Sequence, residues 1–161
     1  MKIIALVLAG LVGTASADDG PTLSTALTGS VALGPVPDTG GYERLDLAVG
    51  ITARHRLHLG AGVGLGNGGQ AGLLAEAFGE AGVWLHASAR VDLLLGWRLG
   101  AARFSIYGMP VHAAMTSSLI ELRYRARANL DVVIQPFTLT GYYNGLWAIV
   151  AGPALGVAVP W

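Results

Sequence analysis

The chain has 161 residues and no cysteine, and only 12% of its residues are charged, whereas an ordinary soluble domain carries about 25%. The lack of cysteine excludes a disulfide framework, a thiolate metal site and a cysteine nucleophile, and the balanced charge excludes the basic surface that nucleic acid requires. With 53% apolar residues and 24 glycines, the sequence offers little with which to cover a soluble surface.

The first segment, "MKIIALVLAGLVGTASA", has the features of an export signal. One lysine precedes an apolar run from Ile3 to Val12, and Ala15, Ser16 and Ala17 form a small-residue cleavage site. The run is too short for a permanent membrane helix, which needs about 20 residues. We therefore predict a cleaved signal peptide over 1–17 and one mature domain over 18–161, in which nine arginines and ten acidic residues leave a formal charge of −1.

Apolar and polar side chains alternate with period two along the mature chain, which predicts strands. The fourth segment is less regular than the others, because Phe78 and Trp84 fall on its polar side; we expect a bulge near Gly79 or Gly82 to re-aim one of them. The eight predicted strand segments lie at 23–33, 45–54, 57–66, 73–86, 90–99, 119–127, 130–135 and 147–161.

The predicted connections alternate between short and long. Short turns fall at 54–56, 86–89 and 127–129, and longer segments rich in Gly, Pro, Asn and Tyr fall at 34–41, 67–72, 102–116 and 137–144. If neighbouring strands form antiparallel hairpins, all short turns lie at one end and all long loops at the other. We expect the longest loop, 102–116, and the tyrosine-rich "FTLTGYYNG" to contact any partner.

The polar side of the strands decides which way each face points. It carries Gly, Ala, Ser and Thr with scattered Arg, Asp, Glu and His but no Lys, which suits a narrow interior, whereas the Leu, Val, Ile and Trp side suits lipid. Strands cross hydrocarbon only as a closed barrel, with about 9–11 residues per strand and an even strand count from eight upward. We therefore predict an all-β fold, an eight-stranded antiparallel transmembrane up-and-down β-barrel.

Charged side chains on the inward-facing side are the densest polar group in the sequence. At eight strands the lumen is just filled by side chains, and an unpaired buried ion costs several kcal/mol. We therefore expect a paired structural network rather than a pore, with a narrow solute or ion channel as an alternative. The predicted lumen charges are Arg44, Asp46, Glu76, Glu80, Arg90, Asp92, Arg98, Glu121, Arg123, Arg125 and Asp131.

Aromatic residues gather toward the ends of the predicted strands, as in the two interfacial girdles of a membrane barrel. Packing in a core is the alternative interpretation. The predicted girdle comprises Tyr42, Phe104, Phe137, Tyr142, Tyr143 and Trp147 at the long-loop end and Trp84 and Trp161 at the other.

The chain ends with "GLWAIVAGPALGVAVPW", in which Leu155, Val157 and Val159 alternate with small residues before Trp161. With this ending and eight strands, the chain resembles the small eight-stranded bacterial outer-membrane β-barrel proteins. Phenylalanine is the usual last residue of that family. Three prolines also depart from the pattern, because proline cannot donate to a ladder; we expect bulge or edge positions for Pro136, Pro153 and Pro160.

The resemblance implies a place in the cell outer membrane, with both termini in the periplasm. The implied partners are outer-membrane lipid and lipopolysaccharide, and the barrel-assembly machinery through the last strand. The expected role is structural or in surface interaction, as a monomer without catalysis, cofactor, metal or nucleic acid.

Other motifs bear on alternative functions, among them a lipid-modifying enzyme on the same barrel, and on an alternative helical fold. "HAS", His86 to Ser88, resembles the His-x-Ser of outer-membrane lipid A deacylases, but it falls in a predicted tight turn. His55, His58 and His112 lack the spacing of metal ligands, and "GAGVGLGNGG" lacks the Lys-Ser/Thr of a phosphate-binding loop. A helical membrane protein is opposed by the charges at every second residue of "ELRYRAR".

Overall fold

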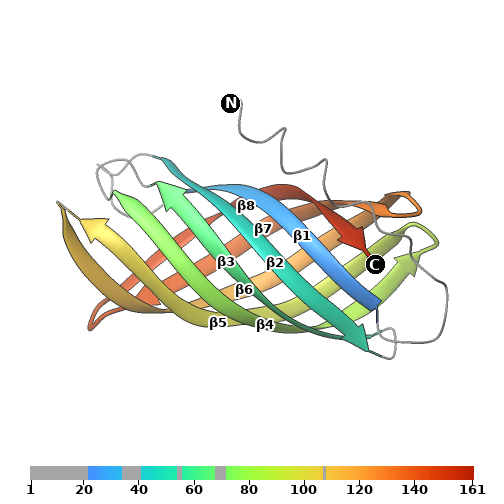
Figure 1. The fold of residues 1–161 in the computed structure, drawn as a ribbon, viewed down its shortest axis with the longest axis horizontal. Coiled ribbons are helices and arrows are strands. Elements are labelled where there is room, and N and C mark those ends of the chain that lie inside the picture. The colour runs from blue at the N-terminus through green and yellow to red at the C-terminus, as the bar shows by residue number, and fades with distance from the viewer. Residues whose placement is uncertain (1–21, 34–40, 54–55, 68–71, 107) are drawn as a thin grey trace.

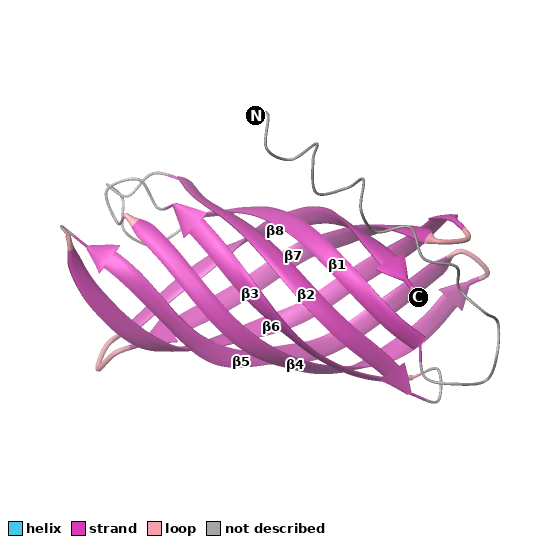
Figure 2. Ribbon diagram, viewed as in Figure 1, coloured by secondary structure: helices cyan, strands magenta, loops and turns pink. Residues whose placement is uncertain are grey.

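In the computed structural model, the described residues are 22–33, 41–53, 56–67, 72–106 and 108–161, with the backbone alone at 32, 33, 41, 42 and 106. The predicted signal peptide lies outside these residues. Eight strands make up almost all of the described chain (Figure 1, Figure 2). They are β1 (Thr22–Leu33), β2 (Gly41–Ala53), β3 (Leu57–Asn67), β4 (Leu73–Ser88), β5 (Val91–Ile106), β6 (Met109–Arg127), β7 (Leu130–Tyr143) and β8 (Trp147–Pro160).

The strands form a closed barrel in chain order, each antiparallel to its neighbours, and β8 closes the barrel on β1. The predicted all-β, eight-stranded up-and-down barrel is confirmed. Figure 1 shows strands tilted across an elongated barrel, with the start of β1 and the end of β8 at the same end. We call this the turn end, since β4 joins β5 and β6 joins β7 there, and we call the opposite end the loop end.

No helix among the described residues is long and apolar enough to cross a membrane.

The distribution of apolar and polar side chains is the reverse of that in a soluble protein. The large apolar side chains of alternate residues point outward and stay exposed, as at Leu59 (66%), Leu99 (63%) and Leu155 (64%). The intervening residues point inward and are buried, including Arg44, Glu76 and Arg98. The predicted assignment of the two faces is therefore confirmed along the strands.

The predictions of two long loops, at 102–116 and 137–144, are wrong. β5 continues to Ile106 and β6 begins at Met109, so most of 102–116 is a hairpin of paired strand, and β7 continues to Tyr143, so the 137–144 loop shrinks to Asn144–Leu146. Large side chains occur on both faces of these segments, for example Met115 inside and Phe137 outside, and ladder hydrogen bonds hold them without strong alternation. The predicted loops at 34–41 and 67–72 fall mainly outside the described residues.

The prediction of a bulge near Gly79 or Gly82 is also wrong. β4 pairs without interruption from Leu74 to His86 with β5, and its ladder shifts only between His86 and Ser88. Phe78 and Trp84 consequently keep their inward direction and are buried. The interior accepts the Phe78 ring because its two cross-strand partners are glycines, Gly62 and Gly100, whereas Trp84 pairs with Leu94.

The prolines of β7 and β8 meet at one irregularity, as expected for a bulge. Between the pairs Gln135↔Ala154 and Thr138↔Gly152, β7 carries Pro136 and Phe137 while β8 carries only Pro153. The extra residue in β7 is a β-bulge, where missing donors cost least.

Side chains complete the hydrogen bonding around this bulge. Thr138 Oγ1 donates to the Gly152 carbonyl at 2.7 Å, and Ser118 Oγ accepts from the Leu139 amide at 3.0 Å. Pro160 is the last strand residue, and beyond it the Trp161 amide donates to the Leu23 carbonyl at 2.7 Å.

Candidate functional site

Arg98 on β5 lies at the middle of the barrel's interior charges. Its Nε donates to Glu80 Oε2 at 2.9 Å and its Nη1 to Asp46 Oδ2 at 3.2 Å, while its guanidinium lies 4.7 Å from the centre of the Phe78 ring. The side chains of Arg98, Asp46 and Glu80 are at most 5% exposed. One buried cation therefore joins β2, β4 and β5 through the lumen.

A second cation, Arg44 on β2, extends these contacts. It pairs with Asp46 on its own strand at 2.8 Å and with Glu76 on β4 at 3.3 Å. The Tyr142 hydroxyl of β7 also donates to Glu76. On the other side, His58 Nε2 lies 2.9 Å from Glu80 Oε1. We call the connected set of Arg44, Asp46, His58, Glu76, Glu80, Arg98 and Tyr142 the central network.

Glycines of β2 and β3 give the central network its space. A Cβ on Gly60 would lie 2.8 Å from Glu80 Oε1, and one on Gly64 would lie 2.7 Å from Asp46 Oδ1. A Cβ on Gly50 would lie 2.3 Å from the His58 ring. The glycines of β2 and β3 therefore admit carboxylates and an imidazole into a barrel that side chains nearly fill.

Apolar side chains pack on the loop-end side of the central network. The cluster includes Leu74, Phe78 and Met115, and the ring of Phe104 meets that of Tyr142 edge-on with centroids 4.9 Å apart. Tyr142 belongs to both groups, since its ring is in the apolar cluster and its hydroxyl is on Glu76.

A second buried polar group lies nearer the turn end. Glu121 accepts from Arg123 Nε at 2.6 Å and from Gln135 Nε2 at 2.9 Å. The Arg123 guanidinium also lies 4.7 Å from the centre of the Trp84 ring. Trp84 packs with Leu94 and Leu119, and its Nε1 donates to Thr52 Oγ1 at 3.1 Å.

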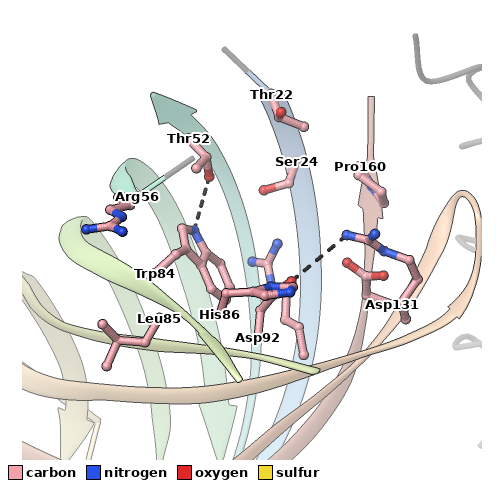
Figure 3. Close-up of a pocket in the computed structure, with 12 residues that line it drawn as sticks. Thr22, Ser24, Thr52, Arg56, Trp84, Leu85, His86, Asp92, Asp131 and Pro160 are labelled. Atoms are coloured by element: carbon pink, nitrogen blue, oxygen red, sulfur yellow. Dashed lines mark hydrogen bonds and ion pairs between the residues drawn. The ribbon is translucent and has the colours of Figure 1, made fainter. Parts of the chain in front are cut away.

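At the turn end the interior opens into a cavity of about 720 Å³ (Figure 3). At its rim, His86 Nδ1 lies 2.6 Å from Asp92 Oδ1, and Arg125 Nη2 lies 3.9 Å from Asp92 Oδ2. We call His86, Asp92 and Arg125 the rim cluster. The cavity is lined by Thr22, Ser24, Thr52, Arg56, Trp84, Leu85, His86, Asp92, Arg123, Arg125, Asp131 and Pro160.

The structure divides the predicted lumen charges into three groups. Five of them meet in the central network, namely Arg44, Asp46, Glu76, Glu80 and Arg98. Glu121 and Arg123 form the second pair, and buried Asp131 lines the cavity, its Oδ1 without a hydrogen bond. Asp92 and Arg125 are at the rim, and Arg90 is exposed in the β4–β5 turn, because the inward parity continues past the end of the barrel.

The predicted girdle needs three corrections. Trp84 and Tyr142 are buried inside the barrel rather than on its outer face, and Phe104 packs against Tyr142. All three residues lie on the inward-facing side of their strands. The outer face carries Phe137, Tyr143, Trp147 and Trp161, while the Tyr42 side chain lies outside the described residues.

Indole groups on the outer face find partners on neighbouring strands. Trp97 Nε1 donates to Thr116 Oγ1 at 2.5 Å, and Trp161 Nε1 donates to Thr25 Oγ1 at 3.2 Å. Trp97, which is 53% exposed, was not predicted as a girdle residue, although its outward parity was recognised. To predict this contact from the sequence, one must know which threonine of the neighbouring strand lies near Trp97. That depends on the register of β5 and β6.

The deacylase-like motif shows no contact between His86 and Ser88. His86 lies against Asp92, whereas Ser88 Oγ accepts from the Arg90 amide at 3.3 Å within the turn. His58 is buried beside Glu80 in the central network, and His55 lies outside the described residues. Within the described ranges, no group of three or more His, Asp or Glu side chains is placed to hold a metal ion.

No protein-family model and no curated protein sequence matches the chain. Solved structures do match it. Neisserial surface protein A has a TM-score of 0.62 and 16% identity over 87% of this chain and 96% of that one. The chain has the fold of small bacterial outer-membrane β-barrels.

Two further outer-membrane barrels support this assignment. The N-terminal β-barrel domain of OprF from Pseudomonas aeruginosa has a TM-score of 0.59 and 14% identity, and covers 87% of this chain and 97% of that one. The attachment invasion locus protein Ail of Yersinia pestis has a TM-score of 0.52 and 13% identity over 88% and 99%. At such identities the likeness concerns the fold alone.

Proposed function

We propose that the chain is a non-catalytic outer-membrane barrel with a structural or surface-interaction role and a lumen filled by side chains. The observation that carries the proposal is the inverted distribution of side chains around a closed barrel. Leucine, valine, isoleucine and tryptophan stay exposed outside, while paired charges are buried inside. In water such a belt would cause association, whereas in hydrocarbon it is the stable face of a transmembrane barrel.

The hydrogen bonds of the outer face support a lipid environment. The exposed ring of Trp97 and the partly buried ring of Trp161 donate to threonine hydroxyls of adjacent strands, and Ser118 accepts from a backbone amide in the bulge region. Polar groups facing hydrocarbon must be satisfied within the protein, because no water is available there. These three contacts meet that requirement at the outer surface.

The proposed orientation places the turn end in the periplasm. The β4–β5 and β6–β7 connections are the two-residue turns Ala89–Arg90 and Ala128–Asn129. Short periplasmic turns are typical of outer-membrane barrels. The proposal includes a monomer whose last strand, β8, followed by Trp161, is read by the barrel-assembly machinery.

Refolding of the mature chain, residues 18–161, into phospholipid vesicles tests this function. We expect a β-type circular dichroism spectrum, a gel mobility that changes on heating, and no large steady single-channel current in a planar bilayer. A current of that kind would contradict the filled lumen and favour a channel. A helical spectrum would contradict the barrel itself.

Lipid A analysis by mass spectrometry tests the non-catalytic part of the proposal. Cells expressing the wild-type chain and the Ser88→Ala variant should contain lipid A with the same acyl chains, since Ser88 serves the turn in this structure. Loss of an acyl chain in the wild type alone would overturn it.

A further inference from the structure

Arg103 on β5 and His112 on β6 form a pair of N–H-donating side chains on the outer face. They are direct cross-strand partners, and both side chains are exposed. Their neighbours Ala102 and Ala113 are buried in the interior, so the alternation of the strands directs Arg103 and His112 outward. Arg44, Arg98 and Arg123, by contrast, are buried in the lumen.

The described part of the chain supplies no anion for this pair. Neither side chain makes a hydrogen bond or ion pair with another described residue. The register surrounds the pair with Ala75 on β4, Ala101 on β5 and Ala114 on β6. The exposed carboxylate of Glu43 is on β2, three strands away.

The pair lies toward the loop end of the apolar belt. Arg103 comes three residues before the end of β5, and His112 comes three residues after the start of β6, whereas exposed Leu99 is farther toward the middle of β5. An arginine on the lipid face is strongly unfavourable at the bilayer midplane but costs little near an interface. The position of Arg103 is therefore that of an interfacial residue.

An aromatic group continues the same level of the outer face. Ala114 pairs with Tyr143 on β7, and Tyr143 pairs with Trp147 on β8. The two rings are exposed, with centroids 5.2 Å apart. Tyrosine and tryptophan prefer the headgroup level of a bilayer, where one side of the ring is apolar and the other is wet.

We infer that Arg103 and His112 bind a phosphate group of a phosphorylated outer-leaflet glycolipid, such as lipid A. A guanidinium offers two parallel N–H donors to a phosphate, and an imidazole of either tautomer offers one more. The surrounding alanines allow a bulky headgroup to approach the strands. The inference rests on the proposed function, because it requires the loop end to face the outer leaflet.

Native mass spectrometry of the refolded mature chain tests this site. Bis-phosphorylated lipid A is titrated against the wild type, Arg103→Ala, His112→Ala and the double variant, and the same titration is repeated with dephosphorylated lipid A. We expect the double variant to bind bis-phosphorylated lipid A at least about tenfold more weakly, and the wild type to prefer the phosphorylated form by a similar factor.

Arg127→Ala is the matched control, since Arg127 is an exposed arginine at the opposite end of β6. It should bind as the wild type does, and Arg103→Lys should retain part of the affinity by keeping the charge. Equal binding by the wild type and the double variant would overturn the inference. So would displacement of lipid A by millimolar inorganic phosphate, which would identify a free anion as the ligand.

Heat-dependent gel mobility, recorded for every variant, separates the two proposals. A wild-type chain that inserts into vesicles but shows no preference for phosphate would contradict this inference alone. A chain that fails to insert would contradict the proposed function first.

Discussion

The central network and the rim cluster use the same chemistry in different surroundings. Both combine carboxylate, arginine and histidine side chains, with three carboxylates and two arginines in the central network and one of each at the rim. In the central network the Asp46 and Arg98 side chains are 4% exposed, whereas at the rim Asp92 is 30% exposed and Arg125 is 56% exposed. From this comparison we expect access to water, rather than residue type, to decide how much an ion pair contributes to the stability of the barrel.

Removing Arg98 should produce the largest effect. Arg98→Met leaves Asp46 and Glu80 buried without their shared cation, and breaking a buried pair in this way costs about 3–5 kcal/mol. The free energy of unfolding, measured in urea with the protein in phospholipid vesicles, should fall by that amount. Too little folded protein to measure would appear as loss of the heat-modifiable gel band.

A neutral background distinguishes loss of the ion pair from loss of packing. In a triple variant that adds Asp46→Asn and Glu80→Gln to Arg98→Met, Arg44 still faces Glu76. Most of the lost stability should return, because no buried charge lacks a partner. A triple variant no more stable than Arg98→Met would show that Arg98 acts mainly through its packing on Phe78.

A smaller effect is expected from filling the space beside the network. In Gly60→Ala the added methyl would lie 2.8 Å from Glu80 Oε1 and 2.9 Å from the Val49 carbonyl oxygen. Overpacking of this kind costs about 1–3 kcal/mol. The matched control is Gly79→Ala, whose nearest neighbour would be 3.9 Å away. Equal urea midpoints for the two variants would refute the steric role of Gly60.

The smallest effect is expected at the rim. Asp92→Asn removes the contacts with His86 and Arg125, but exposed pairs contribute only about 0.2–1 kcal/mol and are screened by salt. Unfolding in 50 mM and 500 mM NaCl should show a small loss that shrinks further at high salt. Asp46→Asn is the same chemical change within the network and should cost more at both concentrations. A reversed order would remove the distinction between the two regions.

The barrel was predictable because alternation has few interpretations when one face is apolar and the other is small and charged. Prediction failed where the contrast between faces is weak. In the hairpin around Gly108, Ala113 and Met115 point inward while Ala114 and Thr116 point outward, so neither face is distinctive. The long-range ladder supplies the stability of such a segment, and its register cannot be read from local sequence.

The interior charges were predictable as a set but not as partners. Parity places Asp46, Glu80 and Arg98 inside, but only the stagger of the strands brings β2, β4 and β5 together around one guanidinium. Trp84 was wrongly predicted to lie in the outer girdle, because the preference of aromatic residues for interfaces was given more weight than its inward parity. In the structure the Trp84 ring packs with Leu94 and Leu119 inside the barrel.

The paired prolines of β7 and β8 also act on how the barrel closes. At the native register, Pro153 lies opposite the two residues of the β7 bulge, where the β7–β8 ladder is already interrupted. A slip of β8 by two residues would preserve which side chains face inward, yet it would move Pro153 away from the β7 bulge and into a regular part of the ladder, where a missing donor costs more. Side-chain alternation alone could not reject that misalignment. The two prolines therefore favour the native register of β8, the strand that closes the barrel.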